Sequence, residues 1–85
     1  MAIYKSDGKK LIDVEYDTLV EVGDVVDEMR VMSVHSKSDE EYGVFLLEPN
    51  TKVTCYVFDE VFIVGKSDGF DSLIDAMEAW SNDEI

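Results

Sequence analysis

The stretch Gly65–Ser67, Gly-Lys-Ser, has the residue types with which a phosphate-binding loop ends. In that loop, backbone N–H groups and the lysine hold the phosphates of a nucleotide. The full pattern requires another glycine five positions earlier, where this sequence has Glu60, whose carboxylate would repel a phosphate. Asp68 and Asp71 follow, where helix N–H groups would have to face the anion. We therefore expect no nucleotide site and predict that residues 65–69 form a turn between the last strand and a helix.

The single cysteine and the single histidine offer little further chemistry. A structural zinc site takes four Cys or His ligands, so these two residues cannot complete one. Placing Gly23, Gly43 or Gly69 at the sixth position of a calcium loop puts apolar residues on ligand positions. No nucleophile elbow or oxyanion loop lies near His35 in the sequence, and Cys55 lies in an apolar run that favours burial. We expect no catalytic residue, no metal and no cofactor.

The charge of the sequence is its main functional signal. Its 85 residues include 20 acidic and 7 basic side chains, which gives a net charge of −13 at pH 7. A surface selected for stability alone intersperses the two signs, but here the acids form two runs without a base. The first run lies between Lys10 and Arg30 and comprises Asp13, Glu15, Asp17, Glu21, Asp24, Asp27 and Glu28; the second follows Lys66 and comprises Asp68, Asp71, Asp75, Glu78, Asp83 and Glu84.

The spacing within each run places like charges side by side. Asp13, Glu15 and Asp17 alternate with other residues, so they fall on one face of a strand, about 6.6 Å apart. The second run repeats at helical spacing, and like charges at that spacing destabilise a helix. We infer that a partner uses these acids. The predicted partner-binding residues are Asp13, Glu15, Asp17, Glu21, Asp24, Asp27, Glu28, Asp71, Asp75 and Glu78.

The sign of the charge decides which partners to expect. Nucleic acids and anionic membranes both require a basic footprint, so we expect neither to bind directly. A basic protein surface is the natural complement. In size, charge and compactness the chain is similar to the small acidic proteins of phages and mobile elements that block host nucleases, restriction enzymes or CRISPR effectors, and to acidic immunity proteins. This resemblance rests on no motif, and it implies a non-enzymatic inhibitor that mimics a nucleic acid in the basic groove of its target.

The alternative is a small SH3-like adaptor or structural module whose charge serves solubility only. A mimic should have one continuous acidic face, whereas an adaptor should have an exposed aromatic patch. Tyr16, Tyr42 and Trp80 are candidate apolar anchors for a partner, and Trp80 also suits a contact between the helix and the sheet. The sequence carries no signal peptide and no apolar run of membrane-spanning length, and it lacks a cysteine pair. We therefore expect a cytoplasmic protein, monomeric or homodimeric.

Turn residues divide residues 2–64 into short strands. Asp7-Gly8 and Glu48-Pro49-Asn50-Thr51 carry turn signals, and Gly23-Asp24 indicates a turn or a bulge. The apolar run 43–47 fits a strand that is buried on both faces. Seven segments have strand-like patterns, namely 2–4, 10–17, 19–26, 30–35, 43–47, 52–58 and 61–64. We expect five or six short strands from these segments.

The hydrophobic period changes after residue 65. Phe70, Leu73, Ile74, Met77 and Trp80 form one stripe of a helix at about 69–80. Asp68 is the expected cap of this helix, Leu73 and Ile74 should be buried, and residues 81–85 should form an acidic tail. The sequence thus predicts one α+β domain over residues 1–85. It is mainly antiparallel β, either an SH3-like or OB-like half-open barrel or a curved sheet, with one C-terminal amphipathic helix.

Overall fold

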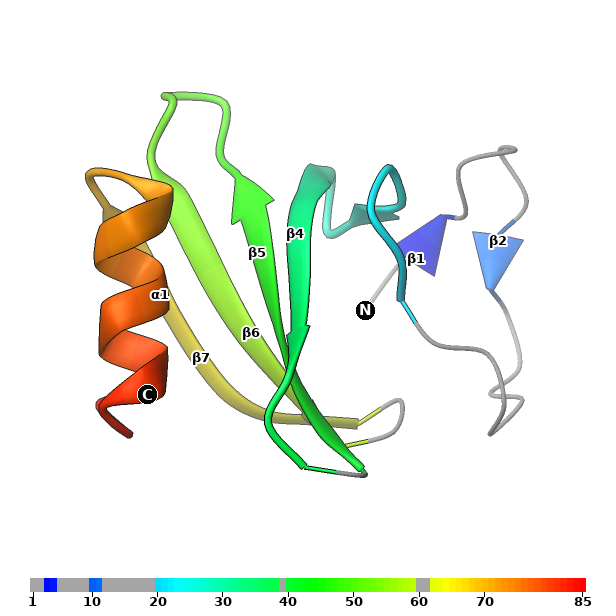
Figure 1. Cartoon of the computed structure of the whole chain (residues 1–85). Helices are drawn as coiled ribbons and strands as arrows, with labels where there is room; N and C mark the ends of the chain where they lie inside the picture. Colours follow the sequence, from blue (N-terminus) through cyan, green and yellow to red (C-terminus); the bar gives the residue numbers. More distant parts are fainter. Residues whose placement is uncertain (1–2, 5–9, 12–19, 39, 60–61) are drawn as a thin grey trace.

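The chain folds into a curled antiparallel sheet with a helix packed against one face (Figure 1). The computed structural model describes residues 3–4, 10–11, 20–38, 40–59 and 62–85. The strands among these residues lie in the spatial order β2-β1-β3-β4-β5-β6-β7. The elements are β1 (Ile3–Tyr4), β2 (Lys10–Leu11), β3 (Val25–Val26), β4 (Met29–Ser36), β5 (Glu41–Leu47), β6 (Val53–Asp59), β7 (Phe62–Phe70) and α1 (Leu73–Ser81). The predicted α+β class, with a half-open curled sheet and a C-terminal helix, is confirmed.

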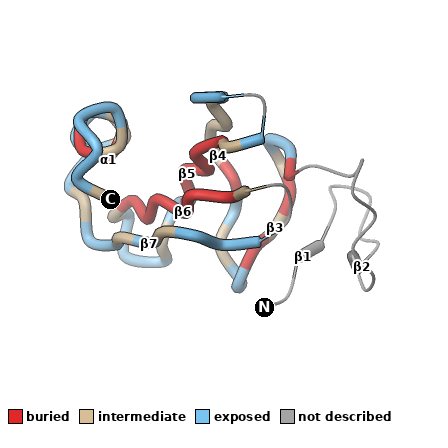
Figure 2. Tube along the Cα trace, turned by 90° about the horizontal axis from the view of Figure 1, so that it is seen from below, coloured by how far each residue is buried: buried red, intermediate tan, exposed pale blue. Residues whose placement is uncertain are grey.

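Each face of the sheet has its own hydrophobic core. The helix-side core consists of Phe45, Val53, Cys55, Val57 and Ala76, with Met32, Phe70, Leu73, Met77, Trp80 and Ile85 packed against them. The inner core, on the other face, consists of Val20, Val26, Val31, Tyr42, Val44, Leu46, Tyr56 and Phe58, with Met29 and Val34. Residues 43–46 are buried and supply both cores, as the apolar run predicts. Strand β6 is buried over residues 53–58, whereas β7 is largely exposed (Figure 2).

Two tight turns set the register of the central hairpins. Asp27 and Glu28 connect β3 to β4 with φ angles of 50° and 67°. Positive φ at both central residues is the requirement of a type I′ turn, which matches the twist of the flanking strands. Between β5 and β6, the Thr51 N–H donates to the Glu48 carbonyl at 3.0 Å. The predicted turn around Pro-Asn is therefore present.

Strand β4 contains a bulge that changes the predicted alternation. The register with β5 shifts between Val31 and Ser33. As a result, Val31 and Val34 both pack in the inner core, while Met32 packs in the helix-side core. Strict alternation over the strand-like segment 30–35 would place Val31 and Val34 on opposite faces of the sheet. The bulge inserts one extra residue and brings both to the same face.

Strand β7 is longer than predicted. The prediction of a turn at residues 65–69 is wrong, because the strand continues through them to Phe70. Gly65 is paired with Val57, and a Cβ at Gly65 would lie 3.3 Å from the Cβ of Val57, so the glycine permits close contact. Gly69 has a φ of 76° and lies where the register with β6 shifts. These glycines therefore serve strand packing and a bulge, two roles that a sequence pattern does not separate from a turn.

Helix α1 consequently begins later than predicted, at Leu73. Its cap is Ser72, whose Oγ accepts a hydrogen bond from the Asp75 N–H at 3.2 Å. Asp68, the expected cap, lies inside β7.

The C-terminal end of α1 closes with a Schellman motif. The Asp83 N–H donates to the Trp80 carbonyl at 3.2 Å, and the Glu84 N–H donates to the Ala79 carbonyl at 2.9 Å. Asp83 takes a φ of 58° at the left-handed position of this motif. Residues 81–85 are therefore tied back to the helix, and Ile85 packs in the helix-side core.

The helix docks through small residues and one tryptophan. Ala76 and Ala79 are buried, which lets the helix approach the sheet closely. Trp80 lies over Gly43 of β5, where a Cβ would come within 2.8 Å of the indole Cε2. Ile74 is 68% exposed, so the prediction of its burial is wrong. With the helix beginning at Leu73 and its two alanines against the sheet, position 74 points into solvent.

One polar contact spans the inner face of the curled sheet. The Tyr56 hydroxyl, on β6, donates to the Asp27 carboxylate, in the β3–β4 turn, at 2.7 Å. Strands β4 and β5 lie between these elements in the sheet order, so the bond requires the curl. Burial, and then the bond to Asp27, raises the pKa of the Tyr56 hydroxyl.

Candidate functional site

The predicted partner-binding acids of the first run have different environments. Asp13, Glu15 and Asp17 lie outside the described residues. Glu21, Asp27 and Glu28 are exposed near β3, although Asp27 already accepts the hydrogen bond from Tyr56. This part of the run therefore offers scattered carboxylates around two turns.

Asp24 is the exception within this run, because it is fully buried. Its Oδ2 accepts a hydrogen bond from the Glu21 N–H at 2.8 Å, and its backbone carbonyl accepts one from the Val31 N–H at 2.9 Å. The carboxylate thus holds the chain before β3 in place. The prediction that Asp24 contacts a partner is corrected, since this side chain has no access to one. A buried acid at a turn has the same sequence signature as an exposed one.

The acids of the second run gather along α1. Asp75 and Glu78 are exposed on the helix, and the last turn of α1 contains no basic residue. Asp71, predicted on the same helical face, precedes the Ser72 cap and lies just outside the helix. Glu84 is exposed beyond the C-terminal end. The result is a line of carboxylates that begins at Asp71, just before the helix, continues with Asp75 and Glu78, and ends at Glu84, beyond the helix.

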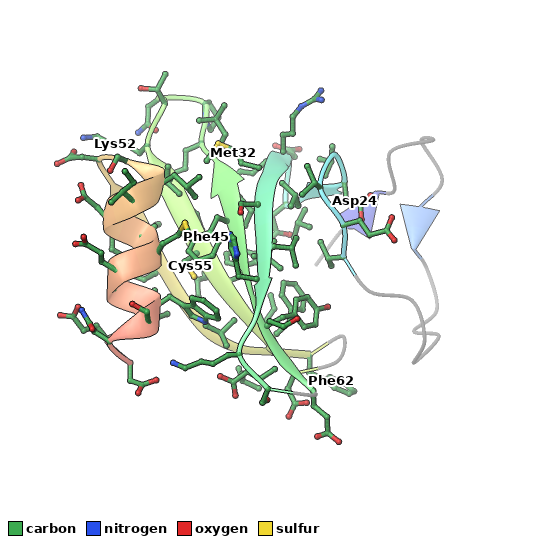
Figure 3. The ribbon with its side chains drawn as sticks, viewed as in Figure 1. Asp24, Met32, Phe45, Lys52, Cys55 and Phe62 are labelled. Carbon is green, nitrogen blue, oxygen red and sulfur yellow. The ribbon has the colours of Figure 1, made fainter. Side chains whose placement is uncertain are left out.

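Two lysines join the ends of this line to the sheet. Lys52, after the β5–β6 turn, forms an ion pair with Asp71, and Lys37, after β4, pairs with Asp83 and also donates to the Trp80 carbonyl at 3.1 Å. The hydrogen bond from Lys52 lowers the pKa of the Asp71 carboxyl, and the same bond raises the pKa of Lys52. In Figure 3, Lys52 lies at the upper end of the helix. These exposed pairs orient the ends of the helix and leave the acids between them facing solvent.

The two groups of acids do not form one surface within the described part of the chain. Figure 1 shows α1 beside β6 and β7, with β3 on the far side of β4 and β5. The helical acids Asp75 and Glu78 therefore lie apart from Glu21 and Glu28. Of the two groups, the one on α1 has the more regular spacing.

The aromatic side chains proposed as anchors are mostly internal. Tyr42 is buried in the inner core, Trp80 packs the helix onto the sheet, and Tyr16 lies outside the described residues. Sequence reasoning missed the exposed apolar end of β7, where Phe62 and Val64 are each 59% exposed and Ile63 is 37% exposed. Phe62 lies at the lower end of the strand, away from the helix (Figure 3). An apolar run at the end of a strand has the same pattern whether it is buried or exposed.

The residues with nucleophilic or metal-binding side chains are placed as follows. Ser33 Oγ and His35 Nε2 form a hydrogen bond, and the His35 ring packs against Phe45 and Trp80, with centroids 5.7 and 6.3 Å away. Cys55 is fully buried, and burial raises the pKa of its thiol to about 12, which suppresses the reactive thiolate. Among the described side chains, no three or more of His, Cys, Asp or Glu are grouped as metal ligands.

The chain matches no model of a known protein family, no curated protein and no solved structure. Within the described residues, no helix has the length and apolar character needed to cross a bilayer. Among the described residues, two surfaces are functional candidates: the carboxylates along α1 and the exposed end of β7.

Proposed function

We propose that this chain is a small acidic inhibitor that occupies the basic groove of a nucleic-acid-binding or nucleic-acid-cleaving protein. The observation that carries the proposal is the line of exposed carboxylates along α1, in which no basic residue interrupts Asp75 and Glu78 and none follows them in the last turn. In this role the chain is a binding protein of the cytoplasm, monomeric or homodimeric, of the kind that phages and mobile elements direct against nucleases, restriction enzymes or CRISPR effectors.

The spacing of these acids supports phosphate mimicry. Asp75 and Glu78 are three residues apart, which is about 4.5 Å along a helix axis. Side chains at this spacing are neighbours on one face of a helix, with Cβ atoms about 5–6 Å apart. Arginine and lysine side chains that line a nucleic-acid groove would therefore meet two adjacent carboxylates. Asp75 lies in the first turn of α1, where the helix dipole favours an acid, whereas Glu78 lies in the last turn, where an acid opposes the dipole. Glu78 therefore does not serve the stability of the helix.

The lysine pairs at the ends of the helix extend the same surface. The side chains of Asp71 and Asp83 keep most of their exposure in their pairs with Lys52 and Lys37. Exposed ion pairs are weak and are screened by salt. Arginines of a partner's groove can therefore replace Lys52 and Lys37 as the partners of Asp71 and Asp83. The acidic surface would then reach both ends of α1.

The test captures the partner and then reverses the charge. The protein is immobilised, its partner is collected from a lysate of the source cell, and release is measured with competing duplex DNA. The variant Asp75→Lys/Glu78→Lys should lose the partner, whereas the matched control Glu21→Lys/Glu28→Lys, with two acids that are also exposed but lie near β3, should retain it. Binding of the purified partner should also weaken steeply between about 50 and about 200 mM salt.

The outcome that contradicts the proposal is equally specific. A partner whose affinity does not change with salt, with DNA or with the reversal on α1 does not use this line of acids. The charge would then serve solubility only, and the adaptor hypothesis would replace mimicry.

A further inference from the structure

The edge of the sheet formed by β7 has a second set of features that the acidic line does not explain. We propose that this edge binds an extended segment of a partner protein, as an added strand, and that basic and apolar side chains alternate along this segment. The inference goes beyond the proposed function, because it uses a different surface and a different physical interaction.

Strand β7 lies at the edge of the sheet among the described strands. The strand stands at the end of the sheet order, so its outer side pairs with no described strand. An edge of this kind presents N–H and C=O groups that another strand can pair with, and proteins usually protect it. The register with β6 shifts at two places along β7: beside Gly69, whose N–H donates to the Glu48 carboxylate at 3.0 Å, and at Val64. Lys66 is also exposed on this strand. Within the described part of the chain, residues 62–67 pair with no strand on their outer side.

The side chains at this end of β7 are apolar and exposed. Phe62, Ile63 and Val64 are exposed together on the edge strand. Aromatic and β-branched side chains gain most from cross-strand neighbours. An added strand would supply such neighbours along the side of β7 that has none in the described structure.

A row of acidic side chains beside β7 favours a positive charge on the added strand. Glu41, Asp59 and Phe62 are direct partners across β5, β6 and β7, so their side chains lie on one face in one row. Two acids directly opposite each other destabilise a sheet. The next residue in this row, on an added strand, would lie beside Phe62. A lysine or arginine there can cover the ring and extend toward Asp59, with a cation–π contact and an ion pair.

The end of the helix strengthens the negative field around this row. A Cβ at Gly65, which neighbours the row, would lie 3.7 Å from the carbonyl carbon of Ile85, so the segment after α1 runs beside β7. The negative end of the helix dipole therefore lies on the same face of β7 as this row. Of the described lysines near this end, Lys37 is engaged by Asp83 and by the Trp80 carbonyl. Lys66 lies over the ring of Tyr56 on the opposite face, with its Nζ 5.3 Å from the ring centroid.

The opposite face of β7, on the side of the inner core, favours apolar side chains on the added strand. Ile63 is paired with Phe58, a residue of the inner core, so a side chain added next to Ile63 meets an apolar surface. Successive residues of a strand point to opposite faces. The chemistry of the two faces thus calls for basic and apolar residues in alternation. A second copy of this chain is the poorer occupant, because it would bring another acidic row and a second net charge of −13 to the same seam.

The experiment uses labelled peptides of about eight residues, the length of an ordinary strand. One peptide alternates arginine and valine, and the other is the same peptide methylated on alternate backbone nitrogens, which keeps its charge and removes strand pairing. Fluorescence anisotropy at about 150 mM salt should show binding of the first peptide and a roughly tenfold or greater weakening for the second, because several backbone hydrogen bonds are lost. Amide hydrogen exchange should slow at residues 62–67 when the first peptide binds.

Matched variants locate the surface. Phe62→Lys should weaken the alternating peptide roughly tenfold, since it removes the ring and adds a like charge. Ile74→Lys changes an equally exposed apolar residue to the same side chain on the helix and should leave binding unchanged. The reversal Asp75→Lys/Glu78→Lys should also leave most of the affinity, which separates this inference from the acidic line on α1.

Three results would overturn the inference. Equal affinity for the two peptides would show simple charge attraction without strand pairing. Slowed exchange confined to residues outside β7 would place the peptide elsewhere. A concentration-dependent dimer in light scattering, abolished by Phe62→Lys, would show that a second copy occupies the edge.

Discussion

Replacing Gly43 by alanine tests whether the contact with Trp80 holds the helix on the sheet. A Cβ at this position would lie 2.8 Å from Cε2 and 3.0 Å from Nε1 of the indole. The strand cannot easily yield, because Gly43 is paired with His35 on one side and with Val57 on the other. Overpacking of this kind costs about 1–3 kcal/mol, while removal of a strand glycine returns about 0.5–1 kcal/mol. We expect a net loss of about 1–2 kcal/mol in the free energy of unfolding.

Urea unfolding measures this loss, and a second background tests its cause. A loss of this size should lower the urea midpoint by about 1 M for a small domain. Trp80→Leu removes the indole, and in that background Gly43→Ala should become neutral or stabilising, as circular dichroism can follow. The change of sign is the signature of direct contact between the two residues. An equal loss in both backgrounds, or a gain of stability in the natural sequence, would refute the reasoning.

Three further predictions follow from burial. Asp24→Ala should lower the free energy of unfolding by about 1–3 kcal/mol, because the Glu21 N–H loses its acceptor, and it should leave partner binding intact; equilibrium unfolding and the capture assay check both. Leu73→Ala should cost about 1–3 kcal/mol, whereas Ile74→Ala should stay within about 0.5 kcal/mol, and equal urea midpoints for the two variants would contradict the docking of α1. The pKa of Cys55 is raised from 9.0 to about 12 in the folded protein. Its contribution to stability is therefore complete below pH 9 and declines between pH 9 and about pH 12, by at most about 1.4 kcal/mol per pH unit. Cys55→Val should remove this part of the alkaline decline, as denaturation curves across that pH range can show.

The central strands were predictable because their signals are local. The apolar run at residues 43–47 and its partner at 52–58 are joined by a turn around Pro49-Asn50, and the structure places them as β5 and β6. Burial on both faces follows from the absence of polar alternation in these segments. The fold class then follows from short strands, tight turns and one helical stripe.

The junction between the last strand and the helix was not predictable in the same way. Gly65 and Gly69 indicate a turn by composition, but their roles depend on Val57 and on the register of a neighbouring strand. Extending β7 to Phe70 moves the helix start to Leu73, and the same shift exposes Ile74. Tertiary packing thus overrides a local turn preference at this position.

The candidate surfaces were predictable only in part. The acids at positions 75 and 78 follow from helical spacing, since a polar stripe opposite an apolar one faces solvent. Asp24 has the same residue type and a similar sequence setting, yet its carboxylate is enclosed by its own turn. The exposure of Phe62 and Val64 depends on β7 being the last strand in the sheet order. Spatial order is a property of the whole fold, which no local pattern contains.

The order of the strands also has a consequence for how the chain folds. From β3 to β7, each strand pairs with the next one in the sequence, and α1 then packs on the strands that precede it. Loop closure between sequence neighbours is entropically inexpensive, so such a topology favours rapid folding. We expect the β5–β6 hairpin to form the kinetic nucleus, because its residues join both cores. Substitutions in these two strands should slow folding, whereas substitutions in α1 should chiefly accelerate unfolding.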